Sequence, residues 1–218
     1  MKTNYFKTAF RFIQKNKLIT AINVLSLAIG ICATLIIFLM IQFDYSFDKH
    51  LPHGDRVYRI VTDGEYKNSG TVTPLIRAIE EEVAGIEASA PIFKIDEAKI
   101  KVETGKEGDF SVFPKERKLV FANDQYFRIY PHQWLAGETK QLEQPNQIIL
   151  TKTLANRFFP HTRVSDVVGK VVLYADTIPL QVAGVVAEMT ENSDFKFDGY
   201  LHGHHRCKRW LKGNLFLG

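Results

Sequence analysis

The chain has 218 residues, of which 45% are hydrophobic and 24% charged, and this composition is typical of folded proteins and not of disordered ones. The formal net charge of +4 hides an asymmetry: all 24 acidic residues lie between Asp44 and Leu201, and that segment carries a net charge of −5. An acidic central segment argues against nucleic-acid binding, because nucleic-acid-binding proteins present a basic face.

Residues 1–17 form a basic leader without acidic side chains, and aromatic residues recur within it at helical spacing. The pattern predicts an amphipathic helix lying along the cytoplasmic surface of a membrane. The alternative is a basic cytoplasmic tail that only sets topology. The basic residues are Lys2, Lys7, Arg11, Lys15 and Lys17.

Residues 18–43 contain no charged side chain, and as a helix they would extend about 39 Å, enough to cross a ~30 Å hydrocarbon core. Basic residues precede the segment, and Asp44 and Asp48 follow it, so we expect a transmembrane helix with a cytoplasmic N-terminus and the rest of the chain outside. A cleaved signal peptide is the rival interpretation. Its apolar core would be shorter and followed by a small-residue cleavage site, which Gln42–Tyr45 does not offer.

One face of this predicted helix carries small and polar residues: Asn23, Ser26, Gly30 and Thr34. Small side chains at this spacing let a second helix approach closely, and polar groups can form hydrogen bonds across the contact. We therefore predict a helix-packing face here. Because no later segment approaches 18 apolar residues, the partner helix must come from another chain or from a missing part of this one.

Residues 44–201 are expected to fold as one α+β domain, because strands and short helices interleave without regular βαβ spacing. Arg56–Val61 alternates like a half-buried strand, and a helix should begin with Thr73 as N-cap and end at Gly85. We expect its buried face to consist of Leu75, Ile76, Ile79 and Val83.

Short strands are predicted in residues 89–95, 98–104, 110–113 and 118–122, with Pro114 as punctuation. A helical turn follows at residues 124–130. A strand at residues 147–150 then leads into a helix capped by Thr151, with Leu154, Phe158 and Phe159 inward. Two further strands lie in residues 170–176 and 179–189. The final pattern, residues 195–201, alternates strongly at first but is weakened by Gly199.

The sequence offers little chemistry. It has no P-loop, GxSxG, HExxH or CxxC motif, so we predict no catalytic residue, no cofactor and no metal site. Cys32 lies inside the predicted membrane span and Cys207 lies near the C-terminus, so the two should not meet and we expect no disulfide framework. Glu80–Glu82 reads as a solvated helix face, and His50 and His53 read as loop residues.

Residues 202–218 form a basic, His-rich tail, whose ligand-like residues are His202, His204, His205 and Cys207. The tail lacks apolar periodicity and changes charge character abruptly. We therefore interpret it as an atypical or out-of-frame end and not as a zinc or copper site.

The leader and span YFKTAFRFIQKNKLITAINVLSLAIGI resemble the start of MacB/FtsX-type ABC transporter permeases, and FDYSFDKHLPHGDRVYRIV resembles the junction into their periplasmic core domain. Later segments are similar to family segments in the same order, and the resemblance covers residues 1–201. These are TPLIRAIEEEVAGIEASA, VFANDQYFRIYPHQWLAGE, NQIILTKTLANRFF, VVGKVVLYADTIPLQVAGVVAEM and NSDFKFDGYL.

The resemblance implies a permease subunit in the bacterial inner membrane that dimerises with a second permease copy or a homologue. It also implies recruitment of a cytoplasmic ATPase, whose ATP-driven motion reaches a non-catalytic periplasmic domain that acts on substrates or periplasmic partner proteins. The family has four or more membrane helices per chain, and this sequence has one, so we expect a truncated or fragmentary permease. The alternatives are a single-pass membrane-anchored sensor or binding protein and a membrane-anchored enzyme.

Overall fold

The computed structural model describes residues 10–61, 73–104 and 108–202. The chain divides into two compact units, residues 1–49 and residues 50–218, and each is described here by itself. The predicted leader helix is covered in part: residues 10–15 are helical, and residues 1–9 lie outside the described residues.

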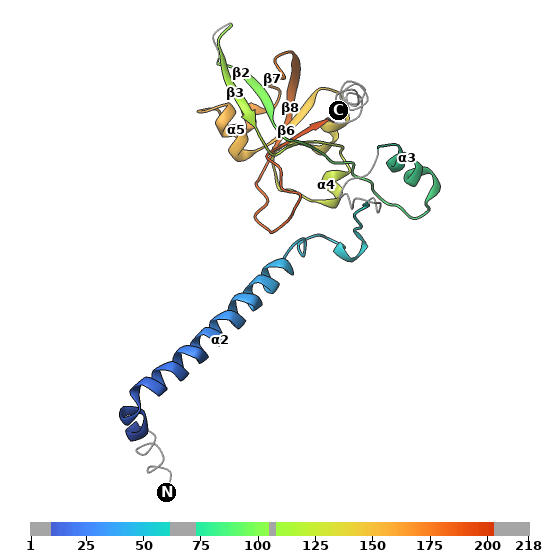
Figure 1. Cartoon of the computed structure of the whole chain (residues 1–218). Helices are drawn as coiled ribbons and strands as arrows, with labels where there is room; N and C mark the ends of the chain where they lie inside the picture. Colours follow the sequence, from blue (N-terminus) through green and yellow to red (C-terminus); the bar gives the residue numbers. More distant parts are fainter. Residues whose placement is uncertain (1–9, 62–72, 105–107, 203–218) are drawn as a thin grey trace, which may run out of the picture. The chain divides into compact units, whose positions relative to one another are not determined.

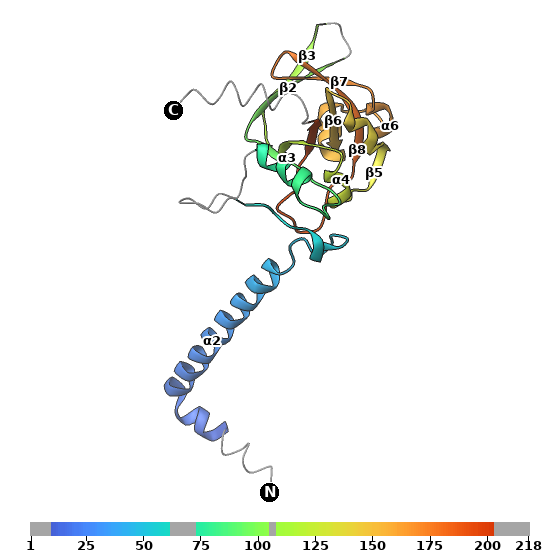
Figure 2. The same cartoon turned by 90° about the vertical axis from the view of Figure 1, so that its right-hand side faces the viewer.

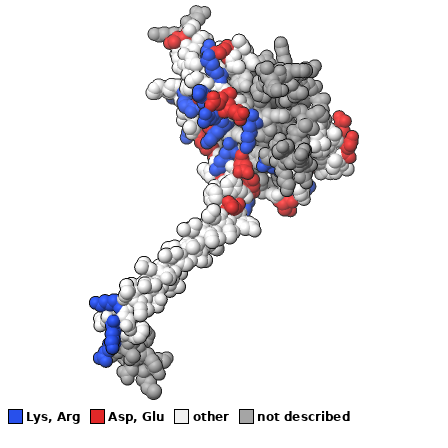
Figure 3. All heavy atoms as spheres, viewed as in Figure 1, with Lys and Arg blue, Asp and Glu red and all other residues white. Residues whose placement is uncertain are grey.

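The first unit is dominated by α2 (Lys17–Asp44), an α-helix of 28 residues. At about 1.5 Å per residue it is ~42 Å long, and it is long and apolar enough to cross a membrane. Residues 18–43 carry no charged side chain, and the face seen in Figure 3 is uncharged, with basic residues gathered at the N-terminal end of the helix. This confirms one N-terminal apolar helix.

The second unit is a mixed α+β domain, as predicted (Figure 1). Its helices are η1 (Gly54–Arg56), α3 (Thr73–Glu82), α4 (Tyr126–Ile129), η2 (Thr139–Glu143), α5 (Lys152–Phe158) and α6 (Val164–Val167). Its strands are β1 (Phe93–Ile95), β2 (Ala98–Glu103), β3 (Phe110–Glu116), β4 (Leu119–Ala122), β5 (Trp134–Gly137), β6 (Gln147–Thr151), β7 (Val171–Tyr174), β8 (Ile178–Val186) and β9 (Gly199–His202).

The strands form one sheet in the order β1-β4-β9-β6-β8-β7-β2-β3. The remaining strand, β5, lies outside this order and pairs with β8. The β4–β9 and β6–β8 pairs are parallel and the others antiparallel. The β2–β3 pair forms a long hairpin at one end of the sheet in both views (Figures 1 and 2). In this strand order β9, the last strand described, lies between β4 and β6.

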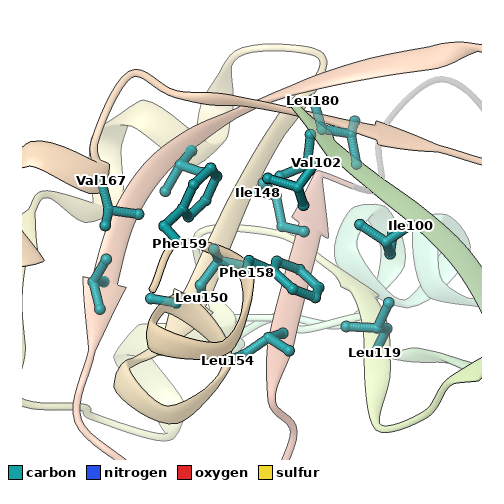
Figure 4. Close-up of a cluster of buried hydrophobic side chains, with 14 of the residues drawn as sticks. Ile100, Val102, Leu119, Ile148, Leu150, Leu154, Phe158, Phe159, Val167 and Leu180 are labelled. Carbon is teal, nitrogen blue, oxygen red and sulfur yellow. The ribbon is translucent and has the colours of Figure 1, made fainter. Parts of the chain in front are cut away.

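Apolar side chains cover both faces of the central strands. All five residues of β6 are buried: Ile148 and Leu150 pack into one cluster, and Ile149 packs into another on the opposite face. This explains why β6 reads as a continuous apolar run and not as an alternating one. The helix-side cluster, under α5 and α6 (Figure 4), comprises Ala98, Ile100, Val102, Leu119, Ile148, Leu150, Leu154, Ala155, Phe158, Phe159, Val167, Val172, Leu180, Val182, Val185 and Leu201.

The second cluster is rich in aromatic rings, and we refer to it as the aromatic cluster. It comprises Leu51, Val120, Ala122, Tyr126, Phe127, Tyr130, Leu142, Ile149, Ala183, Val186, Phe197 and Tyr200. Because the sheet is sandwiched between two clusters, its central strands cannot move independently of the short helices that cover them.

Several local predictions are confirmed. The Thr151 side chain accepts a hydrogen bond from the Leu154 backbone N–H at 3.4 Å and so caps α5, and Leu154, Phe158 and Phe159 are buried. α3 forms where the Thr73 signal predicted a helix, and Gly85 follows it with φ +91°.

Other local predictions are wrong. Residues 57–61 form no strand. Their apolar and polar side chains alternate, but among the described residues no neighbouring strand pairs with them. The expected buried face of α3 is not buried: Leu75 is 37% and Val83 51% exposed, and Ile76 and Ile79 are half-buried.

Proline and glycine also act differently from the prediction. β3 runs through Pro114, which an edge strand tolerates because one side of it needs no N–H donor. Gly199 does not weaken a strand but begins β9. A Cβ there would lie 2.7 Å from Leu119 Cδ2, so a larger residue at this position would require the buried Leu119 side chain to shift. β5 and α6 were not predicted.

Candidate functional site

Three of the predicted helix-packing residues share one surface of α2. Ser26, Gly30 and Thr34 line a shallow concavity together with Leu27, Ile31 and Leu35, which the sequence pattern did not single out. Asn23 is not part of that lining.

The concavity owes its shape to Gly30, since no atom lies within 4 Å of the position that a Cβ would occupy there. The flanking hydroxyls are already satisfied inside the helix: Ser26 Oγ donates to the Ile22 carbonyl and Thr34 Oγ1 to the Gly30 carbonyl, each at 2.9 Å. The surface is therefore suited to close backbone packing more than to polar recognition.

The second unit contains a polar network buried within the aromatic cluster. His132 Nδ1 lies 2.7 Å from the Tyr130 carbonyl, and its Nε2 lies 2.8 Å from the Tyr200 hydroxyl. Because a carbonyl can only accept, Nδ1 carries the proton, and Nε2 accepts from Tyr200. The Tyr126 hydroxyl donates to the Phe195 carbonyl at 2.7 Å. The network ties α4, the loop before β5 and β9 together.

Burial keeps this network uncharged. Desolvation lowers the pKa of His132 from its ordinary value of 6.5, and the nearby His50 lowers it further, against opposing contributions from the Tyr130 carbonyl and Glu191. Desolvation also raises the pKa of Tyr200 to about 12. A neutral imidazole and a protonated phenol that bond to each other make a structural brace.

The segment that follows α2 contacts the aromatic cluster through Leu51, which is 8% exposed and packs within the cluster. The neighbouring His50 has both ring nitrogens buried, and neither has a hydrogen-bond partner among the described residues. A buried apolar side chain and a buried unsatisfied imidazole thus stand next to each other in sequence. The prediction placed His50 and His53 in a loop, and it gave no signal for the burial of Leu51.

The other candidate ligand residues are dispersed. Glu80–Glu82 are exposed on α3, and His202 Nδ1 bonds to the Leu142 carbonyl from the end of β9. His204, His205 and Cys207 lie outside the described residues. Within the ranges that the structure covers, no three His, Cys, Asp or Glu residues are grouped to hold a metal ion.

In a comparison with protein families, residues 20–203 match the family described as MacB-like periplasmic core domain. The matched range begins inside α2 and ends just after β9, so it includes the apolar helix and the whole sheet. None of the curated proteins matched the chain.

The solved structures to which the chain is similar include the following three. A domain assigned to a permease protein from Porphyromonas gingivalis is 20% identical, with a TM-score of 0.45, over 59% of this chain and 55% of that one. The periplasmic region of MacB from Actinobacillus actinomycetemcomitans is 16% identical, with a TM-score of 0.47, over 68% and 60%. The extracellular domain of the noncanonic ABC-type transporter YknZ from Gram-positive bacteria is 16% identical, with a TM-score of 0.40, over 67% of each chain. The chain thus spans little more than half the length of the first two structures.

Proposed function

The chain belongs to the family of proteins with a MacB-like periplasmic core domain, and we propose that it is a membrane subunit of an ABC transporter whose periplasmic domain transmits ATP-driven motion. The observation that supports this most is the continuity of the family match from α2 through β9. An apolar helix and an extracytoplasmic domain therefore occur together as one family unit.

We propose the orientation from the charges. The basic leader, including Arg11, Lys15 and Lys17, remains in the cytoplasm, α2 crosses the inner membrane, and residues after Phe43 face the periplasm. The division of the chain into leader (1–17), membrane helix (18–43), periplasmic domain (44–201) and tail (202–218) is part of this proposal.

The architecture supports a mechanical role for the periplasmic domain. A sheet packed on both faces moves as a rigid body, and the His132–Tyr200 brace joins segments that are distant in sequence. ATP is hydrolysed by a separate cytoplasmic subunit, and the domain acts on a substrate or partner protein outside. The surface of Ser26, Gly30 and Thr34 packs against a membrane helix of a second permease copy or homologue.

Two measurements test this proposal. The full chain, carrying an affinity tag after residue 218, is isolated from the membranes of its own cells in mild detergent. The expected result is co-isolation of a protein with a P-loop ATPase domain, and an isolate that contains no such protein contradicts the proposal.

The second measurement is topology. Tyr58 is 84% exposed, so Tyr58→Cys should react with a membrane-impermeant maleimide in intact spheroplasts. Lys2→Cys should react only after permeabilisation. Both variants are made in a Cys32→Ala, Cys207→Ser background. The reverse labelling pattern would contradict the proposed orientation.

A further inference from the structure

The first buried side chain on the C-terminal side of α2, among the described residues, is that of Leu51 in the second unit. Among the described residues from Phe10 to Glu97, Leu51 is the one that is buried. The residues on its C-terminal side, Pro52–Arg56, are all exposed, and Val57 is half-buried against the same cluster. Only six residues separate Asp44, the last residue of α2, from Leu51.

The receiving surface is built by the sheet unit without help from this segment. Leu51 belongs to the aromatic cluster, whose members from α4 and β9 include Tyr126 and Tyr200, and these already bond to each other or to the main chain. The helix-side cluster does not include Leu51. Loss of the Leu51 side chain would therefore leave the sheet and the helices α5 and α6 that cover its other face in place.

His50 makes the attachment weaker than Leu51 alone would. Both of its ring nitrogens are buried without a hydrogen-bond partner among the described residues. Such a group is hydrated when the segment detaches, so its burial favours release. The attachment is thus a balance between Leu51, which gains from docking, and His50, which loses by it; Asp48 Oδ1, two residues earlier, is also buried without a hydrogen-bond partner among the described residues.

We propose that Leu51 is a releasable latch through which displacement of the membrane helix reaches the aromatic cluster, with His50 setting how readily the latch opens. The coupling role rests on the proposed transport function, but the latch itself does not. The local hydrogen bonds that report its opening are Gly54 N–H to the Leu51 carbonyl and Arg56 N–H to the His53 carbonyl, at 3.2 and 2.8 Å.

Amide hydrogen exchange of the full chain in lipid nanodiscs tests the latch. Leu51→Ala should accelerate exchange of residues 51–57 about tenfold, which corresponds to ~1.4 kcal/mol, with no change in β6. His50→Leu removes the unsatisfied nitrogens at similar volume and should slow exchange in the same peptide several-fold. Leu51→Met should stay near wild type. Tyr58→Ala, at a side chain 84% exposed, is the matched control and should have no effect.

Three results would overturn the latch. The first is unchanged exchange at residues 51–57 in Leu51→Ala. The second is a parallel rise in β6, which would make Leu51 an ordinary core residue whose loss unfolds the whole domain. The third is faster exchange in His50→Leu.

Coupling is measured separately with the co-isolated ATPase. Leu51→Ala should retain ATP turnover and lose most of the action of the periplasmic domain on its substrate or partner protein. Equal retention of ATP turnover and of that action would refute the coupling role. If the wild-type chain shows neither activity, the proposed transport function fails, while the exchange results still decide the latch.

Discussion

Replacement of Gly137 by alanine tests how tightly β5 is packed on β8. Gly137 has φ +79°, and a Cβ there would collide with the Ala183 carbonyl oxygen and lie 2.6 Å from Gly184 Cα. Both obstacles are backbone atoms, so no side-chain rotation relieves the contact. β5 would have to move away from β8, which also anchors β6 and β7.

The magnitude follows from two separable effects. A left-handed φ costs an L-residue about 1–2 kcal/mol, reduced by ~0.4–1 kcal/mol because alanine lowers the entropy of the unfolded chain. Overpacking against an unyielding neighbour adds about 1–3 kcal/mol. We therefore expect Gly137→Ala to lower the free energy of unfolding by about 2–4 kcal/mol, a large share of the ~5–15 kcal/mol typical of a domain.

Gly169 provides the matched control, because it has the same kind of backbone and no crowding. Its φ is +87°, and the nearest atom to a Cβ would be Gln181 Nε2 at 3.9 Å. Gly169→Ala should lower the free energy of unfolding by only about 1 kcal/mol. Urea unfolding of the full chain in mild detergent, followed by far-ultraviolet circular dichroism, measures both. Equal losses in the two variants would refute the packing argument for β5.

Two further predictions concern pH and the membrane helix. The pKa of His132 is lowered in the folded state, so as the pH falls below about 6.5 the unfolded chain takes up a proton before the folded chain does. The free energy of unfolding, measured by urea titration, should therefore fall from pH 7 to pH 5. His132→Gln should flatten that dependence. Gly30→Leu should weaken association of full-length chains in bilayers at least tenfold, measured by energy transfer between labelled copies, because the side chain fills the concavity without an intramolecular clash. Ala28→Leu lies on the opposite side of the helix and should have no such effect, and equal weakening in both variants would contradict a specific face.

Sequence patterns predicted the features that depend on local chemistry. The absence of charge predicted α2, the Thr151 cap predicted the start of α5, and the apolar run predicted β6. Each of these signals lies within or directly beside the element that it predicts. The family assignment rested on the order of several such segments, and the match over residues 20–203 confirms it.

The features that were missed depend on long-range partners. Val57–Val61 has the alternation of a strand but no strand beside it among the described residues, and the apolar stripe of α3 stays largely uncovered. β5 was missed because Trp134–Gly137 is short, and its pairing depends on Gly184, 50 positions from Trp134. The burial of Leu51 could not be read from a turn-rich segment, since only the folded sheet creates the surface that receives it.

The position of β9 has a consequence for biogenesis. This strand is the last one described, yet it lies between β4 and β6, paired in parallel with the first and antiparallel with the second. In the proposed orientation, β1 and β4 pair with the remainder of the described sheet only through β9, so until residues 199–202 have crossed the bilayer their apolar faces stay exposed to water. Maturation of the domain must therefore wait for nearly all of residues 50–202 to be translocated, and during that interval the nascent chain would need shielding from aggregation.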